Sequence, residues 1–148
     1  RGLGDVYKRQ MYNRNKYMDV LDEYKERKIN DAGVAFFDLN GLKMINDKKG
    51  HKAGDTYICL AAGTFIKKFP ENAYRIGGDE FVIIMPDVNK AVFECEVHKL
   101  QEEMQKKGVS ISMGYLWRKS VDDMVDMLNE ADRLMYEEKK HYYQSNKA

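Results

Sequence analysis

Apolar residues recur at helical spacing in several segments of the chain. Between residues 12 and 28 they alternate with charged residues at the spacing of an amphipathic surface helix; they are Tyr17, Met18, Leu21 and Tyr24. Residues 53–69 carry a wider apolar face, and Pro70 is expected to end that helix. Shorter or less regular patterns predict helices over residues 42–47, from about 86 to 107 and from about 120 to 142.

Other apolar segments have the pattern of strands. Residues 33–37 form a continuous apolar run, which is typical of a strand buried on both faces, and residues 30–33 read as the turn before it. Residues 73–76 and 81–85 flank two adjacent glycines and predict a hairpin. Residues 109–117 alternate as in a strand with one exposed face. The last helix is expected to open on Ser120-x-x-Asp123, which has the form of a capping box.

The predicted order is helix, strand, two helices, hairpin, helix, strand, helix. This order indicates an α/β (α+β) domain of the ferredoxin-like or polymerase-palm kind. We expect two layers, with a central mixed, largely antiparallel sheet flanked by helices.

Composition narrows the function classes. The chain of 148 residues suits one domain, and a formal net charge of +1 gives no field that would draw it to nucleic acid or to an anionic membrane. No apolar run is long enough to span a membrane. Cys59 and Cys95 form no metal-ligand cluster and are expected to be buried, reduced thiols. A cytoplasmic location follows, which a membrane-anchored parent protein would also allow.

The predicted hairpin carries the first candidate chemistry. Gly77 and Gly78 are expected to adopt the positive φ angles of a tight turn and to let an anionic ligand approach the backbone. Asp79 and Glu80 follow directly, so the tip is a candidate metal or phosphate site. The alternative is a surface hairpin with charged residues after its turn.

A second acidic residue ends the predicted buried strand. If that strand lies beside the hairpin, Asp38 and Asp79 meet at one edge of the sheet. Carboxylates at the ends of buried strands are costly unless a cation neutralises them. Oxygen ligands without histidine or cysteine favour Mg²⁺ or Mn²⁺. The alternative is that Asp38 caps the following helix.

Residues 75–81 read Arg-Ile-Gly-Gly-Asp-Glu-Phe, which matches the signature that names the GGDEF family of diguanylate cyclases. Residues 37–47, with the pairs at 50–51 and 54–55, resemble the metal- and guanine-binding region of that family. The resemblance extends from residue 11 to about 143. It implies an enzyme that condenses two GTP into cyclic di-GMP and two pyrophosphates. It also implies two Mg²⁺ or Mn²⁺ ions per active site and a homodimer, because each domain holds one GTP.

The resemblance also implies roles for residues of the metal site. The metal ligands would be Asp38, the Leu39 carbonyl, Asp79 and Glu80. Glu80 is also the candidate proton acceptor. Gly77 and Gly78 would leave room for the triphosphate.

Further roles concern the nucleotide. Lys43 and Lys139 match positions that touch phosphates, with solvated lysines as the alternative. Asn46 and Asp55 match positions that read the guanine edge, because a carboxylate accepts from guanine N1 and N2 and adenine offers no such pair. The alternatives are a surface amide for Asn46 and a helix cap for Asp55. His51 is interpreted as structural.

The chain departs from the family pattern at two places. Many members have Arg-x-x-Asp shortly before the signature, where it binds product and inhibits the enzyme. Lys68 and Glu71 stand there in this chain. Lysine lacks the planar fork of arginine, so product inhibition is expected to be weak or absent. Tyr143 stands near a position where the family often has a phosphate-binding arginine.

Residues 1–10 resemble a translated sequencing adapter and are interpreted as an artefactual leader. The sequence therefore predicts an N-terminally truncated GGDEF domain over residues 11–148, with an upstream sensor or dimerisation domain missing. Two rivals to the cyclase remain. One is a catalytically inactive module that senses GTP or cyclic di-GMP, and the other is a cyclase with relaxed base choice, against which Asp55 argues.

Overall fold

The computed structural model describes residues 11–146. The predicted leader, residues 1–10, lies outside this range, as do the last two residues. Within it the chain forms a four-stranded sheet and five helices. None of these helices is long and apolar enough to cross a membrane.

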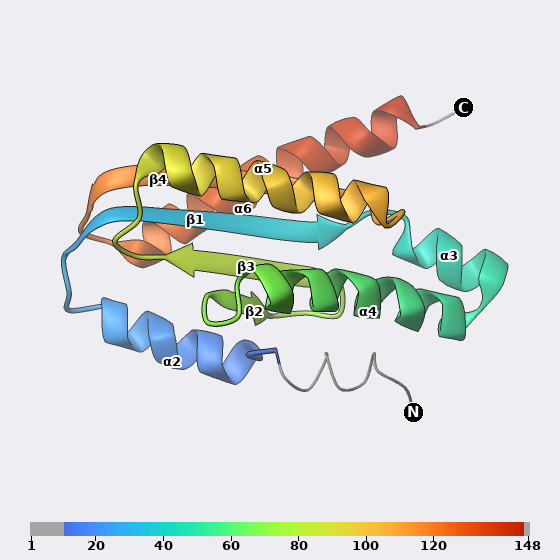
Figure 1. The fold of residues 1–148 in the computed structure, drawn as a ribbon, viewed down its shortest axis with the longest axis horizontal. Coiled ribbons are helices and arrows are strands. Elements are labelled where there is room, and N and C mark those ends of the chain that lie inside the picture. Colours follow the sequence, from blue (N-terminus) through green and yellow to red (C-terminus); the bar gives the residue numbers. More distant parts are fainter. Residues whose placement is uncertain (1–10, 147–148) are drawn as a thin grey trace.

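The elements follow one another in the predicted order (Figure 1). They are α2 (Arg14–Tyr24), β1 (Ile29–Leu39), α3 (Leu42–Lys49), α4 (His51–Lys68), β2 (Ala73–Arg75), β3 (Glu80–Met85), α5 (Lys90–Lys106), β4 (Ile111–Val121) and α6 (Met124–Ser145).

The sheet has the strand order β2-β3-β1-β4, and all its neighbouring strands are antiparallel. An isolated parallel bridge joins Tyr12 to Tyr74 beside β2. The central strand β1 pairs with β3 over residues 33–38 and with β4 over most of its length. This is the antiparallel sheet of a ferredoxin-like arrangement.

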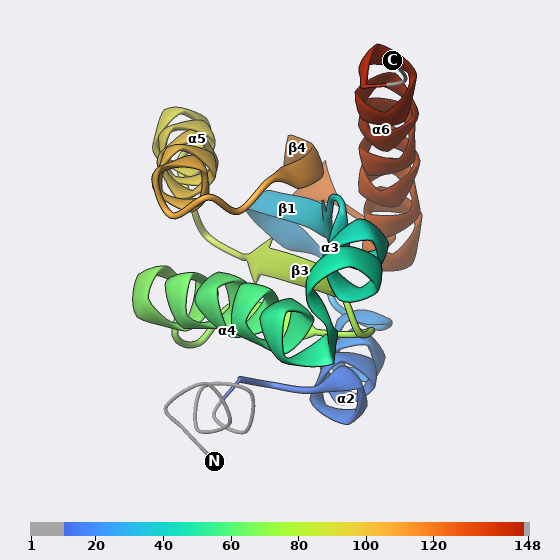
Figure 2. The ribbon, with the colours of Figure 1, turned by 90° about the vertical axis from the view of Figure 1, so that its right-hand side faces the viewer.

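Helices cover both faces of the sheet, as Figure 2 shows. Side chains of β1 alternate between two hydrophobic cores. One core joins the sheet to α4 and α5 and includes Phe37, and the other joins it to α2 and α6 and includes Val34. The predicted class is confirmed, and the helices on both faces give the sheet three layers where two were expected.

Two local predictions are wrong. Residues 30–33, expected to form a turn, lie inside β1, because Ile29 is buried and pairs with Val121 of β4. Asp31, one of the residues that suggested a turn, has a positive φ of 54° but lies within the strand. The capping box at Ser120 is also absent, because β4 continues to Val121. Asp123 caps α6 instead, and its side chain accepts from the Asp126 amide.

The cysteine prediction is wrong in its burial. Cys59 is only half-buried on α4, and Cys95 is exposed on α5. Neither forms a disulfide, as expected for reduced thiols. Their helices turn other side chains toward the core, including Ala61, Phe65, Phe93 and Val97.

Candidate active site

The hairpin between β2 and β3 differs in detail from the predicted tight turn. Four residues, 76–79, connect the strands, and the Ile76 and Gly77 amides both donate to the Glu80 carbonyl at 3.0 and 3.4 Å. Neither Gly77 nor Gly78 has a positive φ, so that part of the prediction is wrong. A Cβ at Gly78 would meet nothing within 4 Å, and one at Gly77 would make only ordinary contact with Glu80. The fold itself therefore does not require glycine at either position.

The end of β1 lies directly beside this hairpin. Asp38 is opposite Glu80 in the strand register, and the Leu39 amide donates to the Asp79 carbonyl at 2.9 Å. Segments 40 residues apart thus bring two acidic sequences to one end of the sheet. We call Asp38, Leu39, Asp79 and Glu80 the acidic edge. Asp38 does not cap the next helix, since Gly41 is the N-cap of α3 and that helix has no side-chain cap.

A lysine from the last helix reaches into the acidic edge. The Lys139 ammonium lies 3.0 Å from Asp38 Oδ2 and donates to the Leu39 carbonyl oxygen at 3.1 Å. The side chains of Lys139 and Asp38 are only 20% and 15% exposed. Lys139 is therefore not a solvated lysine, the alternative left open by the sequence. The other carboxylate oxygen of Asp38, Oδ1, is buried and has no hydrogen-bond partner.

The acids of this edge are held in an unfavourable electrostatic setting. Burial raises the pKa of Asp38 from 3.8 to about 6; the hydrogen bond from Lys139 opposes this rise and the nearby Asp79 carboxylate adds to it. Burial also raises the pKa of Glu80, and Asp79 again adds to the rise. Crowded, partly desolvated carboxylates of this kind become more stable beside a cation.

A divalent cation fits the donor set of the acidic edge. Asp38 Oδ1 is an unpartnered buried acceptor, and the two oxygens that Lys139 contacts already bind a positive charge. Within residues 11–146 no three acidic, histidine or cysteine side chains are grouped so as to enclose a metal. Mg²⁺ is commonly held by one or two carboxylates together with substrate phosphates and water, so an open donor set suits it.

The predicted guanine-reading residues meet where α3 and α4 pack together. Asn46 lies on α3, and a Cβ at Gly54 of α4 would overlap its Oδ1 atom. Asp55 follows Gly54 and is exposed on α4. We call Asn46, Gly54 and Asp55 the α3–α4 corner. Asp55 lies a full turn inside α4, whose N-cap is Gly50, so it is not a helix cap.

The family described as "Diguanylate cyclase, GGDEF domain" matches residues 8–145. The chain belongs to this family.

Two curated relatives are similar to this GGDEF domain in sequence. The signaling protein YkoW of Bacillus subtilis is 34% identical over 117 residues, which cover 70% of this chain and 14% of YkoW. Diguanylate cyclase DgcS of Shewanella oneidensis is 32% identical over 122 residues, 77% of this chain and 41% of DgcS. The chain therefore spans less than half the length of either relative.

A solved structure has the same fold. The coiled coil and GGDEF domain of DgcB from Caulobacter crescentus, in complex with c-di-GMP, superposes with a TM-score of 0.77 at 22% identity. The match covers 88% of this chain and 78% of DgcB. At this identity the likeness establishes the fold alone.

Sequence reasoning missed the polar residues that hold the end of β1 in this GGDEF domain. Asn40 is 3% exposed, and its amide group joins the hydroxyls of Ser110 and Ser112 at 3.1 and 2.8 Å. The Tyr57 hydroxyl donates to the Asn40 carbonyl at 2.9 Å. These bonds fix the chain directly after the acidic edge. The signal was weak, because an asparagine before glycine reads as an ordinary turn residue.

Two arginines that sequence reasoning did not assign hold the hairpin loop. Arg75 donates to the Gly78 carbonyl at 2.8 Å, and Arg14 of α2 donates to the Ile76 carbonyl at 3.3 Å. The GGDEF signature contains Arg75, so this residue could have been found from the resemblance.

The remaining predicted residues lie apart from the acidic edge or are exposed. Lys43 is exposed on α3. Lys68 forms ion pairs with Glu96 and Glu103 of α5, at 3.0 and 3.9 Å, while Glu71 is exposed in the loop after α4. Tyr143 does not replace arginine as a cation, but its hydroxyl accepts from the Gly41 amide at 3.3 Å.

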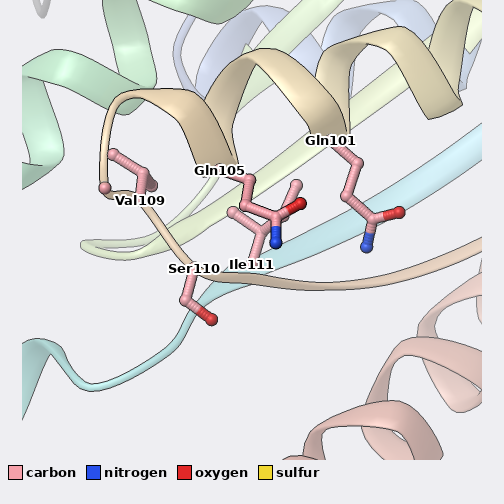
Figure 3. Close-up of a pocket in the computed structure, with 6 residues that line it drawn as sticks. Gln101, Gln105, Val109, Ser110 and Ile111 are labelled. Carbon is pink, nitrogen blue, oxygen red and sulfur yellow. The ribbon is translucent and has the colours of Figure 1, made fainter.

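A separate cavity of about 390 Å³ lies between α5 and the start of β4. Figure 3 shows Gln101 and Gln105 extending from α5 on this side of the domain. The lining of this cavity contains amides, one hydroxyl and apolar groups, and no residue of the acidic edge or the α3–α4 corner. Its chemistry gives no reason to assign it a catalytic role.

Proposed function

We propose that this chain is a diguanylate cyclase, which joins two GTP into cyclic di-GMP and releases two pyrophosphates. One observation carries the proposal. The register of β1 with β3 brings Asp38 opposite Glu80, and the Leu39 amide bonds to the Asp79 carbonyl. Acidic oxygens from two distant segments thus meet beside a loop whose glycines are not required by the fold.

Asp38, the Leu39 carbonyl, Asp79 and Glu80 would hold two Mg²⁺ or Mn²⁺ ions. Bound there, these ions supply activation of a ribose 3′-hydroxyl and neutralisation of the triphosphate and leaving pyrophosphate. The raised pKa of Glu80 suits it to accept the proton that leaves this hydroxyl. The 3′-oxygen forms a bond to the α-phosphorus of the other GTP, and the bond from that phosphorus to pyrophosphate breaks.

The other residues orient the nucleotide. Gly77 and Gly78 let the triphosphate approach the loop backbone, since a Cβ at Gly78 would project into open space and one at Gly77 would lie against Glu80. Lys139 and Lys43 contact phosphates of the bound triphosphate and of the leaving pyrophosphate. At the α3–α4 corner, the Asp55 carboxylate accepts from guanine N1 and N2, and Asn46 offers an amide to the same base.

The product requires two domains that face each other, because each one holds a single GTP and each 3′-hydroxyl attacks the other nucleotide. We therefore propose a homodimer as the active form. In the parent protein an upstream sensor or dimerisation segment would bring the domains together, so the fragment alone is expected to turn over slowly.

The test is incubation of the purified chain with GTP and Mg²⁺, followed by chromatography of the nucleotides, beside the variant Asp79→Ala. We expect cyclic di-GMP and pyrophosphate from the wild type. Loss of a metal ligand removes several kcal/mol of transition-state stabilisation, so the variant should be slower by on the order of 1,000-fold. A fused dimeric coiled coil guards against failure through weak dimerisation.

Two outcomes would contradict the proposal. If the dimeric fusion and its Asp79→Ala variant bind GTP equally and form no product, the chain is a binding module. If a mixture of GTP and ATP gives mixed cyclic dinucleotides, the reaction class stands and the assignment of guanine selectivity to Asp55 is wrong.

A further inference from the structure

The inference concerns Lys139, and it rests on the proposed function. The Lys139 ammonium contacts Asp38 Oδ2 and the Leu39 carbonyl oxygen, which are two of the oxygens assigned to the metal ions. A lysine ammonium has three donors and one positive charge on a flexible stem, so it can serve as a counter-ion for such oxygens.

We propose that Lys139 and a divalent cation compete for the same oxygens, so that Lys139 acts as the built-in counter-ion of the acidic edge. Mg²⁺ binds oxygen at about 2.0–2.1 Å, which is closer than an ammonium can approach. A cation bound to Asp38 and Leu39 therefore lies within a few ångströms of the ammonium position. Repulsion between the two positive charges in a partly buried site drives Lys139 away.

The surroundings of Lys139 allow this movement. The side chain comes from α6, about two turns before its end, and its ammonium lies 5.7 Å from the centroid of the Tyr143 ring. The Tyr143 hydroxyl accepts from the Gly41 amide, which holds the ring beside the start of α3. The displaced ammonium can remain over this ring or pair with an arriving phosphate. One lysine would then serve first the carboxylate and afterwards the nucleotide.

If Lys139 helped to bind the cation or were merely structural, its removal would weaken cation binding or leave it unchanged. Competition predicts the opposite change. Removing the Lys139 charge should strengthen cation binding, because the cation no longer has to displace a competing charge. We expect Lys139→Gln and Lys139→Met to bind Mn²⁺ more tightly than the wild type, by on the order of tenfold, a usual size for coupling between two sites. Lys139→Arg keeps the charge and should return the affinity toward that of the wild type.

The experiment titrates the purified chain with Mn²⁺ alone and follows free Mn²⁺ by electron paramagnetic resonance. The matched control is Lys140→Gln, one residue along the same helix, whose ammonium pairs with Glu137 at 3.7 Å and lies over the Tyr136 ring. Thermal unfolding with and without Mn²⁺ provides a second measurement. The rise in melting temperature on adding Mn²⁺ should be larger for Lys139→Gln than for the wild type.

Each result decides the matter. Tighter binding in the Lys139→Gln and Lys139→Met variants, with Lys140→Gln unchanged, supports competition. Equal or weaker binding in the Lys139 variants overturns the inference and leaves the cyclase proposal intact. An equal gain in Lys140→Gln also overturns it, because the effect would then come from net charge. If neither the wild type nor any Lys139 variant binds Mn²⁺, the inference is overturned, because removing the competing charge then opens no site for the free cation. The assay with GTP and Mg²⁺ tests the proposed function separately.

Discussion

The acidic edge and the α3–α4 corner have different physical supports. The acidic edge stands at the ends of paired strands, with Asp38 only 15% exposed and its neighbours fixed by backbone hydrogen bonds. The corner stands on two helices, and Asp55 is exposed on one of them. Groups that hold concentrated charge are thus placed by the sheet, whose register leaves little freedom. Groups that we propose to read a base are placed by the packing of one side chain against a helix.

Glycine has a different purpose in each region. At the corner, a Cβ at Gly54 would overlap the Asn46 amide group, so glycine there leaves that side chain in place. At the hairpin, Gly78 has free space around it and no positive φ. A glycine that the protein itself does not need points to a need of the ligand.

The substitution Gly78→Ala tests this difference most strongly. The free energy of unfolding should change by less than about 0.5 kcal/mol, as for surface substitutions in general. Cyclase activity should fall by roughly 100-fold, because a misplaced phosphate costs about that much. Urea unfolding and initial rates of cyclic di-GMP formation measure the two effects. Full activity in this variant would remove the distinction between the two glycines.

At the corner, Asp55→Asn removes a charged acceptor for the guanine edge. Hydrogen bonds to charged groups contribute about 1.5–3 kcal/mol, so the KM for GTP should rise by roughly 10- to 100-fold. Discrimination against ATP should fall by a similar factor. Asp47→Asn, an exposed acid on neighbouring α3, is the control and should leave both quantities unchanged.

Gly54→Ala acts on the same corner indirectly. The added Cβ displaces Asn46, so the KM for GTP should rise by about tenfold with little change in kcat. Alanine is favoured over glycine inside a helix by about 1 kcal/mol, which offsets part of the packing cost. A kcat loss as large as that of Gly78→Ala would show that the two regions are not separable.

The pH dependence of the free energy of unfolding tests the acidic edge alone. The folded-state pKa of Asp38 is raised to about 6, so between pH 4 and 6 the folded protein holds a proton that the unfolded chain has lost. The stability that this proton contributes is present below pH 4 and is lost as the pH rises through 6, by roughly 3 kcal/mol at most. The variant Asp38→Asn should not lose this stability, because its amide does not titrate. Urea unfolding in EDTA should therefore show the wild type losing stability relative to Asp38→Asn from pH 4 to 7.

The smallest expected effect lies outside both regions. Because Lys68 pairs with α5 and lacks the fork of arginine, added cyclic di-GMP should change the initial rate by less than about twofold. The double variant Lys68→Arg, Glu71→Asp should become more sensitive to product. Strong inhibition of the wild type would show that lysine suffices at this position.

Much of the fold was predictable because the hydrophobic pattern is strong. The run at residues 33–37 identified the buried central strand, and Pro70 marked the end of α4 within two residues. The strand ends were not predictable from the pattern. Asp31 looks like a turn residue, yet pairing of Ile29 with Val121 extends β1 beyond it. Long-range pairing decided what local propensity could not.

For the candidate site, the acidic residues were found from the strand and hairpin pattern as well as from the resemblance, and the structure brings Asp38 and the hairpin together at one edge. The conformation of Gly77 and Gly78 was not predictable, because glycine permits many conformations and requires none. The contact of Lys139 with Asp38 crosses about 100 residues, and the support from Asn40 depends on a buried network. Neither leaves a local pattern in the sequence.

The reach of α6 back to the first strand has a practical consequence for choosing domain boundaries. Lys139 and Tyr143 both touch the segment at Leu39 and Gly41, although they belong to the final turns of the chain. A fragment that stops before Lys139 would keep every strand and most of both cores. It would also leave Asp38 without the positive neighbour that balances its charge, so a well-folded sample could still give misleading cation affinities.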